Sequence, residues 1–131
     1  MPCDTPRLLG DDDWLTQVGR RLPATDEYVF PNRLRPLKDP PETDLSMLLG
    51  VISPVDARRH AFGATAMKPG RNAARRVRVG GLRSAGFRVE HTPRHPGSPL
   101  HVSVFWDGED GWDDKVAVLL DDCCMGGEVH E

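Results

Sequence analysis

Three histidines lie close together in the last third of the chain, and two adjacent cysteines follow them. His91, His95 and His101 fall within eleven positions, and Cys123 and Cys124 come later in the sequence. Neutral imidazole nitrogens and thiolate sulfurs are ligands that zinc prefers in proteins. These residue types therefore raise the question of a metal site near the C-terminus.

The spacing of these residues does not match a zinc motif. His91 and His95 are four positions apart, which would place them on one helical face, but three prolines between residues 91 and 101 exclude a helix. Adjacent cysteines at the end of an amphipathic helix are more often packed than metal-binding. We therefore predict no cofactor, and the alternative is zinc held by His91, His101, Cys123 and Cys124.

A histidine beside a hydroxyl side chain could instead perform acid–base or nucleophilic chemistry. His101 with Ser103 is one such pair, and His91 is a further candidate base. A hydroxyl nucleophile needs a base and a third group that orients the base, and spacing alone does not supply these. The chain also contains no G-x-S-x-G or Walker A pattern. A non-enzymatic protein is the main hypothesis, and a hydrolase-like enzyme is an alternative.

Charge is strongly segregated along the sequence. The formal net charge of −3 divides into −4 over residues 1–56, +9 over residues 57–101 and −8 over residues 102–131. A basic block suggests an anionic partner such as a phosphate backbone. An acidic segment in the same small domain favours neutralisation within the molecule or docking to another protein.

These charges lead to two hypotheses for binding. The first is a protein-interaction module, an accessory or adaptor protein that docks another protein through its basic block and acidic C-terminal segment. The alternative is nucleic-acid binding through the arginine-rich segment 71–88, although only two aromatic residues interrupt the basic block. Trp112 is a candidate contact because tryptophan is enriched at interaction hot spots, and packing under the last helix is the competing interpretation. The candidate binding residues are Arg71, Arg75, Arg76, Arg78, Arg83 and Trp112.

Length and composition limit the fold and the location. The 131 residues are typical of one domain, and 25 of them are Gly or Pro, which indicates many loops. Three cysteines form no disulfide framework, and no apolar run is long enough for a membrane span or a secretory signal. We expect a cytoplasmic protein with no membrane association, and frayed termini at residues 1–10 and 125–131.

Three helices are expected in the first two thirds of the chain. Acidic residues 11–13 precede apolar positions at helical spacing, which predicts a helix over 14–22. Residues 23–50 contain five prolines and predict an irregular arm with at most a short edge strand at 28–30. A second helix would open at Ser53 and run to residue 66, and a third would cover 73–85 and stop at Gly86. A strand over 76–79 followed by a glycine turn is the alternative to the third helix.

The last third predicts two strands and a helix. Residues 87–91 and 101–106 alternate apolar and polar side chains with a period of two, which predicts neighbouring antiparallel strands. Asp113 or Asp114 would cap a helix with apolar residues at i, i+3, i+4 and i+7. The expected fold class is α+β, with three to four short helices packed on a small antiparallel sheet of two to three strands and a long proline-rich irregular arm.

The stretch GGLRSAGFRVEHTPRHPGSPLHVSVFW, residues 80–106, resembles small uncharacterised actinobacterial proteins. The similar positions are residues 21–23, Leu45-Ser46, residues 86–89 and residues 99–104. No established activity comes with this resemblance. It implies that His101 after a proline-containing loop is a feature of such proteins, and that they act as accessory parts of multi-protein systems.

Overall fold

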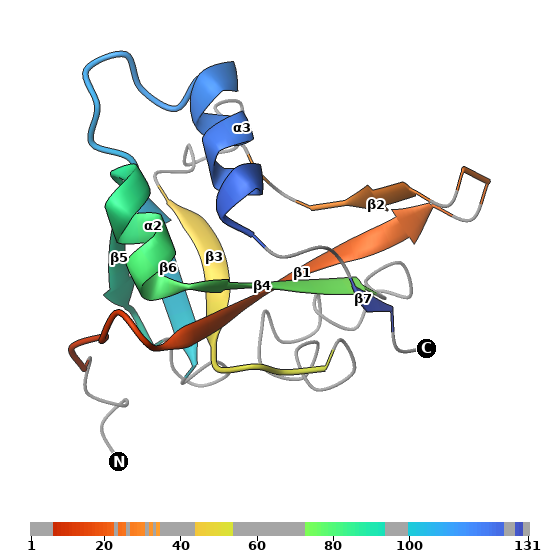
Figure 1. The fold of residues 1–131 in the computed structure, drawn as a ribbon, viewed down its shortest axis with the longest axis horizontal. Coiled ribbons are helices and arrows are strands. Elements are labelled where there is room, and N and C mark those ends of the chain that lie inside the picture. The colour runs from red at the N-terminus through yellow and green to blue at the C-terminus, as the bar shows by residue number, and fades with distance from the viewer. Residues whose placement is uncertain are drawn as a thin grey trace.

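The fold is built mainly from antiparallel strands. A computed structural model describes residues 7–22, 24–25, 27–30, 32, 34, 44–53, 73–93, 100–124 and 128–129. Their elements follow the chain in the order β1 (Trp14–Leu22), β2 (Glu27–Val29), β3 (Leu45–Leu49), β4 (Ala73–Arg78), α2 (Val79–Ala85), β5 (Arg88–His91), β6 (His101–Phe105), α3 (Asp114–Cys123) and β7 (Glu128–Val129) (Figure 1).

The strands form one twisted sheet in the order β5-β6-β3-β1-β4-β7, and β2 pairs with the far end of β1. Every strand pair is antiparallel. The long strand β1 crosses the centre, where Leu15 lies opposite Val77 of β4 on one side and Leu49 of β3 on the other. Strand β5 is the outermost strand at one end of this order.

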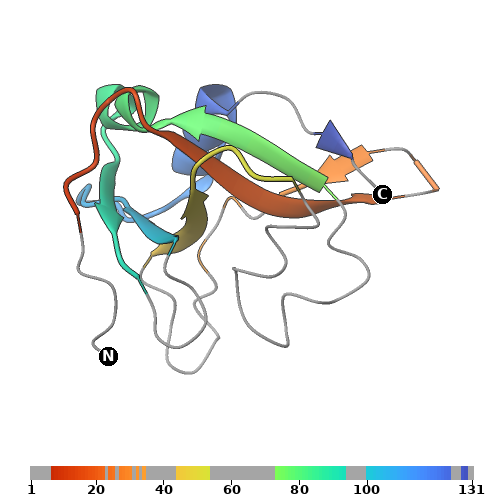
Figure 2. The same cartoon turned by 90° about the horizontal axis from the view of Figure 1, so that it is seen from below.

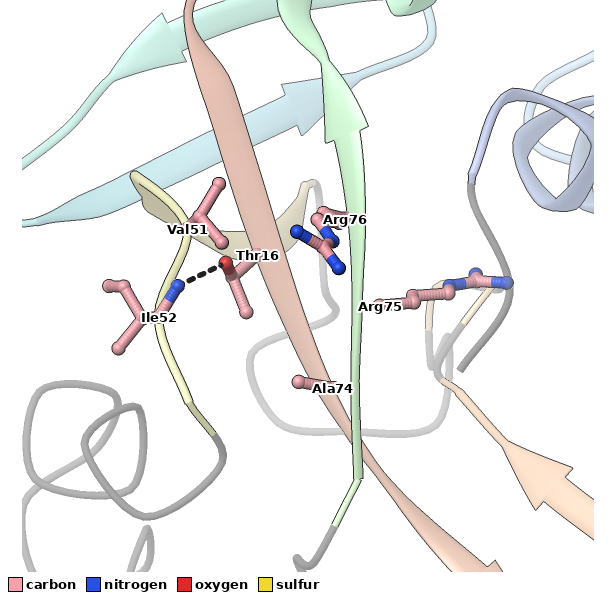
Figure 3. A pocket seen from close by; sticks show the side chains of 6 residues that line it. All are labelled: Thr16, Val51, Ile52, Ala74, Arg75 and Arg76. Carbon is pink, nitrogen blue, oxygen red and sulfur yellow. Dashed lines mark hydrogen bonds between the residues drawn. The ribbon is translucent and has the colours of Figure 1, made fainter. Parts of the chain in front are cut away.

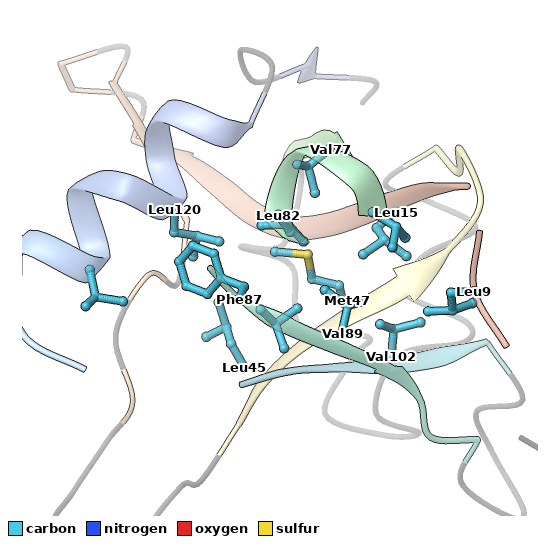
Figure 4. Packing of buried hydrophobic residues seen from close by; sticks show 13 residues of the cluster. Leu9, Leu15, Leu45, Met47, Val77, Leu82, Phe87, Val89, Val102 and Leu120 are labelled. Atoms are coloured by element: carbon cyan, nitrogen blue, oxygen red, sulfur yellow. The ribbon is translucent and has the colours of Figure 1, made fainter. Parts of the chain in front are cut away.

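Both described helices cover the same face of the sheet, which is the side of the main core (Figure 2). Leu82 of α2 and Leu120 of α3 are fully buried there and pack with Phe87 and Met47 (Figure 4). Burying apolar area in this way is the dominant favourable contribution to folding. The buried cluster consists of Leu9, Leu15, Leu45, Met47, Val77, Val79, Leu82, Phe87, Val89, Val102, Val104, Val116 and Leu120.

The predicted helix over 14–22 is wrong, because these residues form strand β1. The apolar residues of β1 face both ways: Leu15 belongs to the core under the helices, whereas Val18 packs with Leu48 on the opposite face. A central strand that is buried on both faces loses its two-residue alternation. Its apolar positions then happen to fit helical spacing.

The predicted helix over 73–85 is wrong in its first half. Residues Ala73–Arg78 form strand β4, and the helix α2 begins only at Val79. The alternative, a strand over 76–79, is correct up to Arg78, but Val79 and the two glycines after it form the first turn of the helix and not a turn between strands. Gly86 ends α2 as predicted, with a left-handed φ of 108°.

The expected fold class is wrong in its proportions. The described residues contain two helices and seven strands, not three to four helices on a two- to three-stranded sheet. Within the segment predicted to be an irregular arm, β2 lies close to the short edge strand expected at 28–30, whereas strand β3 was not predicted. The helix expected between Ser53 and residue 66 lies almost entirely outside the described residues.

The two strands and the helix predicted in the last third of the chain are confirmed, whereas residues 128 and 129, expected to lie in a frayed terminus, form strand β7. Strands β5 and β6 pair antiparallel, with Val89 opposite Val104. Helix α3 begins after Asp113, whose carboxylate accepts a hydrogen bond from the backbone N–H of Val116 at 3.1 Å. This is the N-cap that the sequence pattern indicates.

Candidate functional site

Arg75, predicted to be a binding residue, is buried beneath α3. Only 8% of its surface is exposed. Its Nε donates to Gln17 Oε1 at 2.8 Å, its Nη1 donates to Asp121 Oδ1 at 2.9 Å, and its guanidinium lies 4.7 Å from the centre of the Phe30 ring. Arg75 therefore connects β1, β4 and α3, and it is not available to an external partner.

The other candidate arginines are dispersed. Arg75 and Arg76 leave β4 on opposite sides (Figure 3), because side chains alternate along a strand. Arg78 lies over the Trp14 ring at 4.6 Å and forms an ion pair with Asp12 at 3.6 Å. Arg83, on α2, forms hydrogen bonds with the Leu9 carbonyl and Asp11. Arg71 lies outside the described residues.

A small hollow lies on the sheet face opposite the helices (Figure 3). Thr16 Oγ1 donates to the Gly50 carbonyl at 2.7 Å and accepts from the Ile52 N–H at 3.0 Å, so this hydroxyl fixes the chain after β3 against β1. The hollow is lined by Thr16, Val51, Ile52, Ala74, Arg75 and Arg76. The hydroxyl group of Thr16 in this wall thus helps to hold the fold together.

His101 is fully buried on this same face, within a chain of hydroxyl groups. Its Nε2 lies 2.8 Å from Ser46 Oγ, and its Nδ1 lies 2.8 Å from Thr92 Oγ1 and 3.1 Å from the Thr92 carbonyl. Ser103 joins the chain through Thr92 Oγ1 at 2.7 Å. The predicted pair of His101 and Ser103 is therefore connected through Thr92 Oγ1, and Ser46 is the hydroxyl partner of His101 Nε2.

This network has the character of a satisfied polar core. Hydrogen bonds at both ring nitrogens keep the buried imidazole compensated, which a buried polar group requires. The involvement of Ser46 and Thr92 was not predicted. The period-two patterns alone do not place Ser46 near His101. That requires the register between β3 and β6, in which Ser46 lies opposite Ser103.

The metal-site candidates are not brought together. His91 lies opposite Val102 in the β5–β6 ladder, so these two side chains share one face of the sheet. His101 precedes Val102 in β6, and its side chain therefore points to the other face. The backbone N–H of Arg7 donates to His91 Nδ1 at 3.1 Å. Among the described residues, no group of three His, Cys, Asp or Glu side chains is placed to hold a metal ion. His95 is not part of the described chain.

Cys123 and Cys124 lie half-buried at the end of α3, against the main core. Burial raises the pKa of the Cys124 thiol to about 11, and the nearby Arg75 charge offsets this only in part. Burial also raises the pKa of Cys123, whose thiol approaches the Gly81 carbonyl at 3.7 Å. The raised pKa of both thiols favours the protonated form, which is a poor nucleophile.

Trp112 is a packing residue. Its ring centre lies 5.5 Å from that of Phe87, and its indole N–H donates to the Asn32 carbonyl at 2.7 Å. These contacts leave the side chain only partly exposed. The competing interpretation of Trp112, packing beside the last helix, is the one that the structure favours.

The outer side of β5 is one edge of the described sheet. The N–H of Thr92 donates to the His101 carbonyl across the β5–β6 ladder. Because hydrogen-bonded pairs alternate in an antiparallel ladder, Arg88 and Glu90 bond to β6, whereas the N–H and C=O of Val89 point away from it. Within the described part of the chain, no strand pairs with this outer side of β5.

Arg88 and Glu90 lie on β5, on the face away from the helices. Their side chains are about half exposed and form an ion pair with each other. Arg88 also bonds to Asp107 at 2.8 Å and lies 4.0 Å from the centre of the Phe105 ring. The hydrogen bond from Arg88 is the main cause that lowers the pKa of Asp107. The period-two pattern of residues 87–91 predicts that Arg88 and Glu90 lie on one face of a strand, but it does not indicate that this strand lies at the edge of the sheet.

Comparisons with known proteins give no relative for this chain: no family model, no curated protein and no solved structure matches it. No helix in the described residues is long and apolar enough to cross a membrane.

Proposed function

We propose that this protein is a non-enzymatic protein-interaction module that takes a strand of its partner onto the outer side of β5. The observation that carries this proposal is the outer side of β5, which no strand of the described residues covers and where the N–H and C=O of Val89 point outward. An extended segment that adds to such an edge gains main-chain hydrogen bonds without any change in the fold.

The distribution of charge supports protein docking over nucleic-acid binding. Arg75, Arg78 and Arg83 each form an ion pair with a carboxylate from a distant part of the chain. A phosphate backbone would have to compete with these carboxylates for each arginine. These three arginines therefore act mainly within the molecule.

The test compares the wild-type protein with a Glu90→Arg variant in a pull-down from the native host lysate after nuclease treatment. Glu27, an exposed strand glutamate on β2, provides the matched control as Glu27→Arg. We expect the wild type and the control to retain a partner that Glu90→Arg retains poorly. The purified partner should then slow hydrogen exchange at the Val89 amide.

Two results would contradict the proposal. If the partner protein is recovered only without nuclease treatment, the result would favour nucleic-acid binding as the function. A partner that leaves the exchange of the Val89 amide unchanged would show that β5 is not the docking element.

A further inference from the structure

The two charges on β5 are arranged to match a second copy of the same strand. The sequence of β5 is Arg88-Val89-Glu90-His91, with Arg88 and Glu90 on either side of Val89. In an antiparallel pair of two such strands centred on Val89, each Arg88 lies directly opposite Glu90 of the other copy. Opposite charges facing each other across a ladder stabilise the pairing.

The backbone of β5 fits the same register. The N–H and C=O of Val89 point outward, so two copies of Val89 can exchange both hydrogen bonds at the centre of the pair. The side chains keep their faces in this arrangement: Val89 stays on the core side and the charged residues stay on the opposite side. The sheets of the two molecules would then continue across the junction.

Charge also disfavours the neighbouring registers. Moving the strands by two residues in one direction places Arg88 opposite Arg88, and moving them in the other direction places Glu90 opposite Glu90. Like charges that face each other across a ladder are destabilising. Charged side chains usually protect an edge strand from association, but here their opposite signs select one self-complementary pairing.

We propose that the strand taken up by β5 is β5 of a second copy, giving a twofold-symmetric dimer in which Arg88 of each chain faces Glu90 of the other. This inference rests on the proposed function, because it names the partner of the same edge. A twofold axis requires that the same patch serves both molecules, and β5 meets this requirement through its own sequence.

The test uses two variants with opposite charge at the edge, measured by light scattering over a concentration series. Glu90→Arg and Arg88→Glu should each weaken the dimer roughly tenfold or more, because like charges then face each other twice. An equimolar mixture of the two variants should recover dimers, since the all-basic edge faces the all-acidic edge. Glu27→Arg, which changes charge by the same amount outside β5, should remain dimeric.

Recovery in the mixture separates lost complementarity from lost folding, because misfolded variants would not associate specifically. A wild-type protein that is monomeric at all concentrations, or a mixture that stays monomeric, would overturn the dimer. If the chain is monomeric and a different protein slows exchange at the Val89 amide, the dimer fails and the docking function stands. If the chain is monomeric and retains no partner protein in the pull-down, both the dimer and the docking function are rejected.

Discussion

At the scale of single residues, burial decides which charges are available for binding. Arg75 and Arg76 are adjacent in the sequence, yet Arg75 is enclosed under α3 whereas Arg76 lies on the other face of β4. Arg75 is tolerated inside because Gln17 and Asp121 accept its hydrogen bonds. A buried charge is costly unless it is paired and hydrogen-bonded in this way.

Removing the carboxylate partner of Arg75 should therefore destabilise the fold. We expect Asp121→Ala to lower the free energy of unfolding by about 1–2 kcal/mol, less than for a fully buried pair because the Asp121 side chain is 42% exposed. The neighbouring exposed residue provides the control, and Asp122→Ala should change stability by less than about 0.5 kcal/mol. Urea unfolding measures both, and equal effects would show that the Arg75 pair contributes little.

The raised pKa of Cys124 makes a prediction about pH. Alkylation of Cys124 in the folded protein at pH 8 should be much slower than in the urea-unfolded chain, because the thiolate is the reactive form. Stability should also fall between pH 9 and about 11, where the unfolded thiol loses its proton and the folded one still holds it. Mass mapping of modified peptides measures the first effect, and Cys124→Ala should reduce the second. Equal alkylation rates would contradict the burial of this thiol.

At the scale of secondary structure, sequence patterns succeeded where an element has one buried face. Strands β5 and β6 and helix α3 show this, since their periodicities place apolar residues on one side. Strand β1 was missed because both of its faces are buried. The candidate site could likewise be predicted only in part. The alternating pattern indicates the face on which Arg88 and Glu90 lie. The position of β5 at the edge of the sheet depends on pairings between residues that are distant in the sequence, which the pattern does not contain.

Helix α2 offers a matched pair of neighbouring glycines. A Cβ at Gly80 would lie 2.9 Å from the Asp11 Cβ and 3.0 Å from the Asp11 carbonyl oxygen, whereas a Cβ at Gly81 would meet nothing within 4 Å. We expect Gly81→Ala to stabilise the protein by up to about 1 kcal/mol through helix propensity. Gly80→Ala should instead lower the unfolding midpoint. Thermal unfolding of both variants checks this, and a stabilising Gly80→Ala would mean that the turn at Asp11 packs less closely.

At the scale of the whole molecule, charges that are segregated in the sequence become paired in space. The acidic residues 11 and 12 reach arginines of β4 and α2, and acidic residues near the C-terminus reach Arg75 and Arg88. In the described part of the basic block, Arg75, Arg78, Arg83 and Arg88 are therefore each paired with a carboxylate. The +9 segment is outweighed in the sequence by the acidic residues on either side of it, which give the chain its net charge of −3.

These ion pairs predict that the protein binds duplex DNA weakly and that this binding depends little on salt concentration. Each phosphate contact releases counterions, so a plot of log K against log salt concentration falls with a slope of roughly −0.9 per phosphate. Because Arg75, Arg78, Arg83 and Arg88 are held by carboxylates, we expect a slope no steeper than about −2. A fluorescence anisotropy titration at several salt concentrations measures it. A slope of about −5 or steeper would mean that the ion pairs open for phosphate, which would favour nucleic acid as the partner.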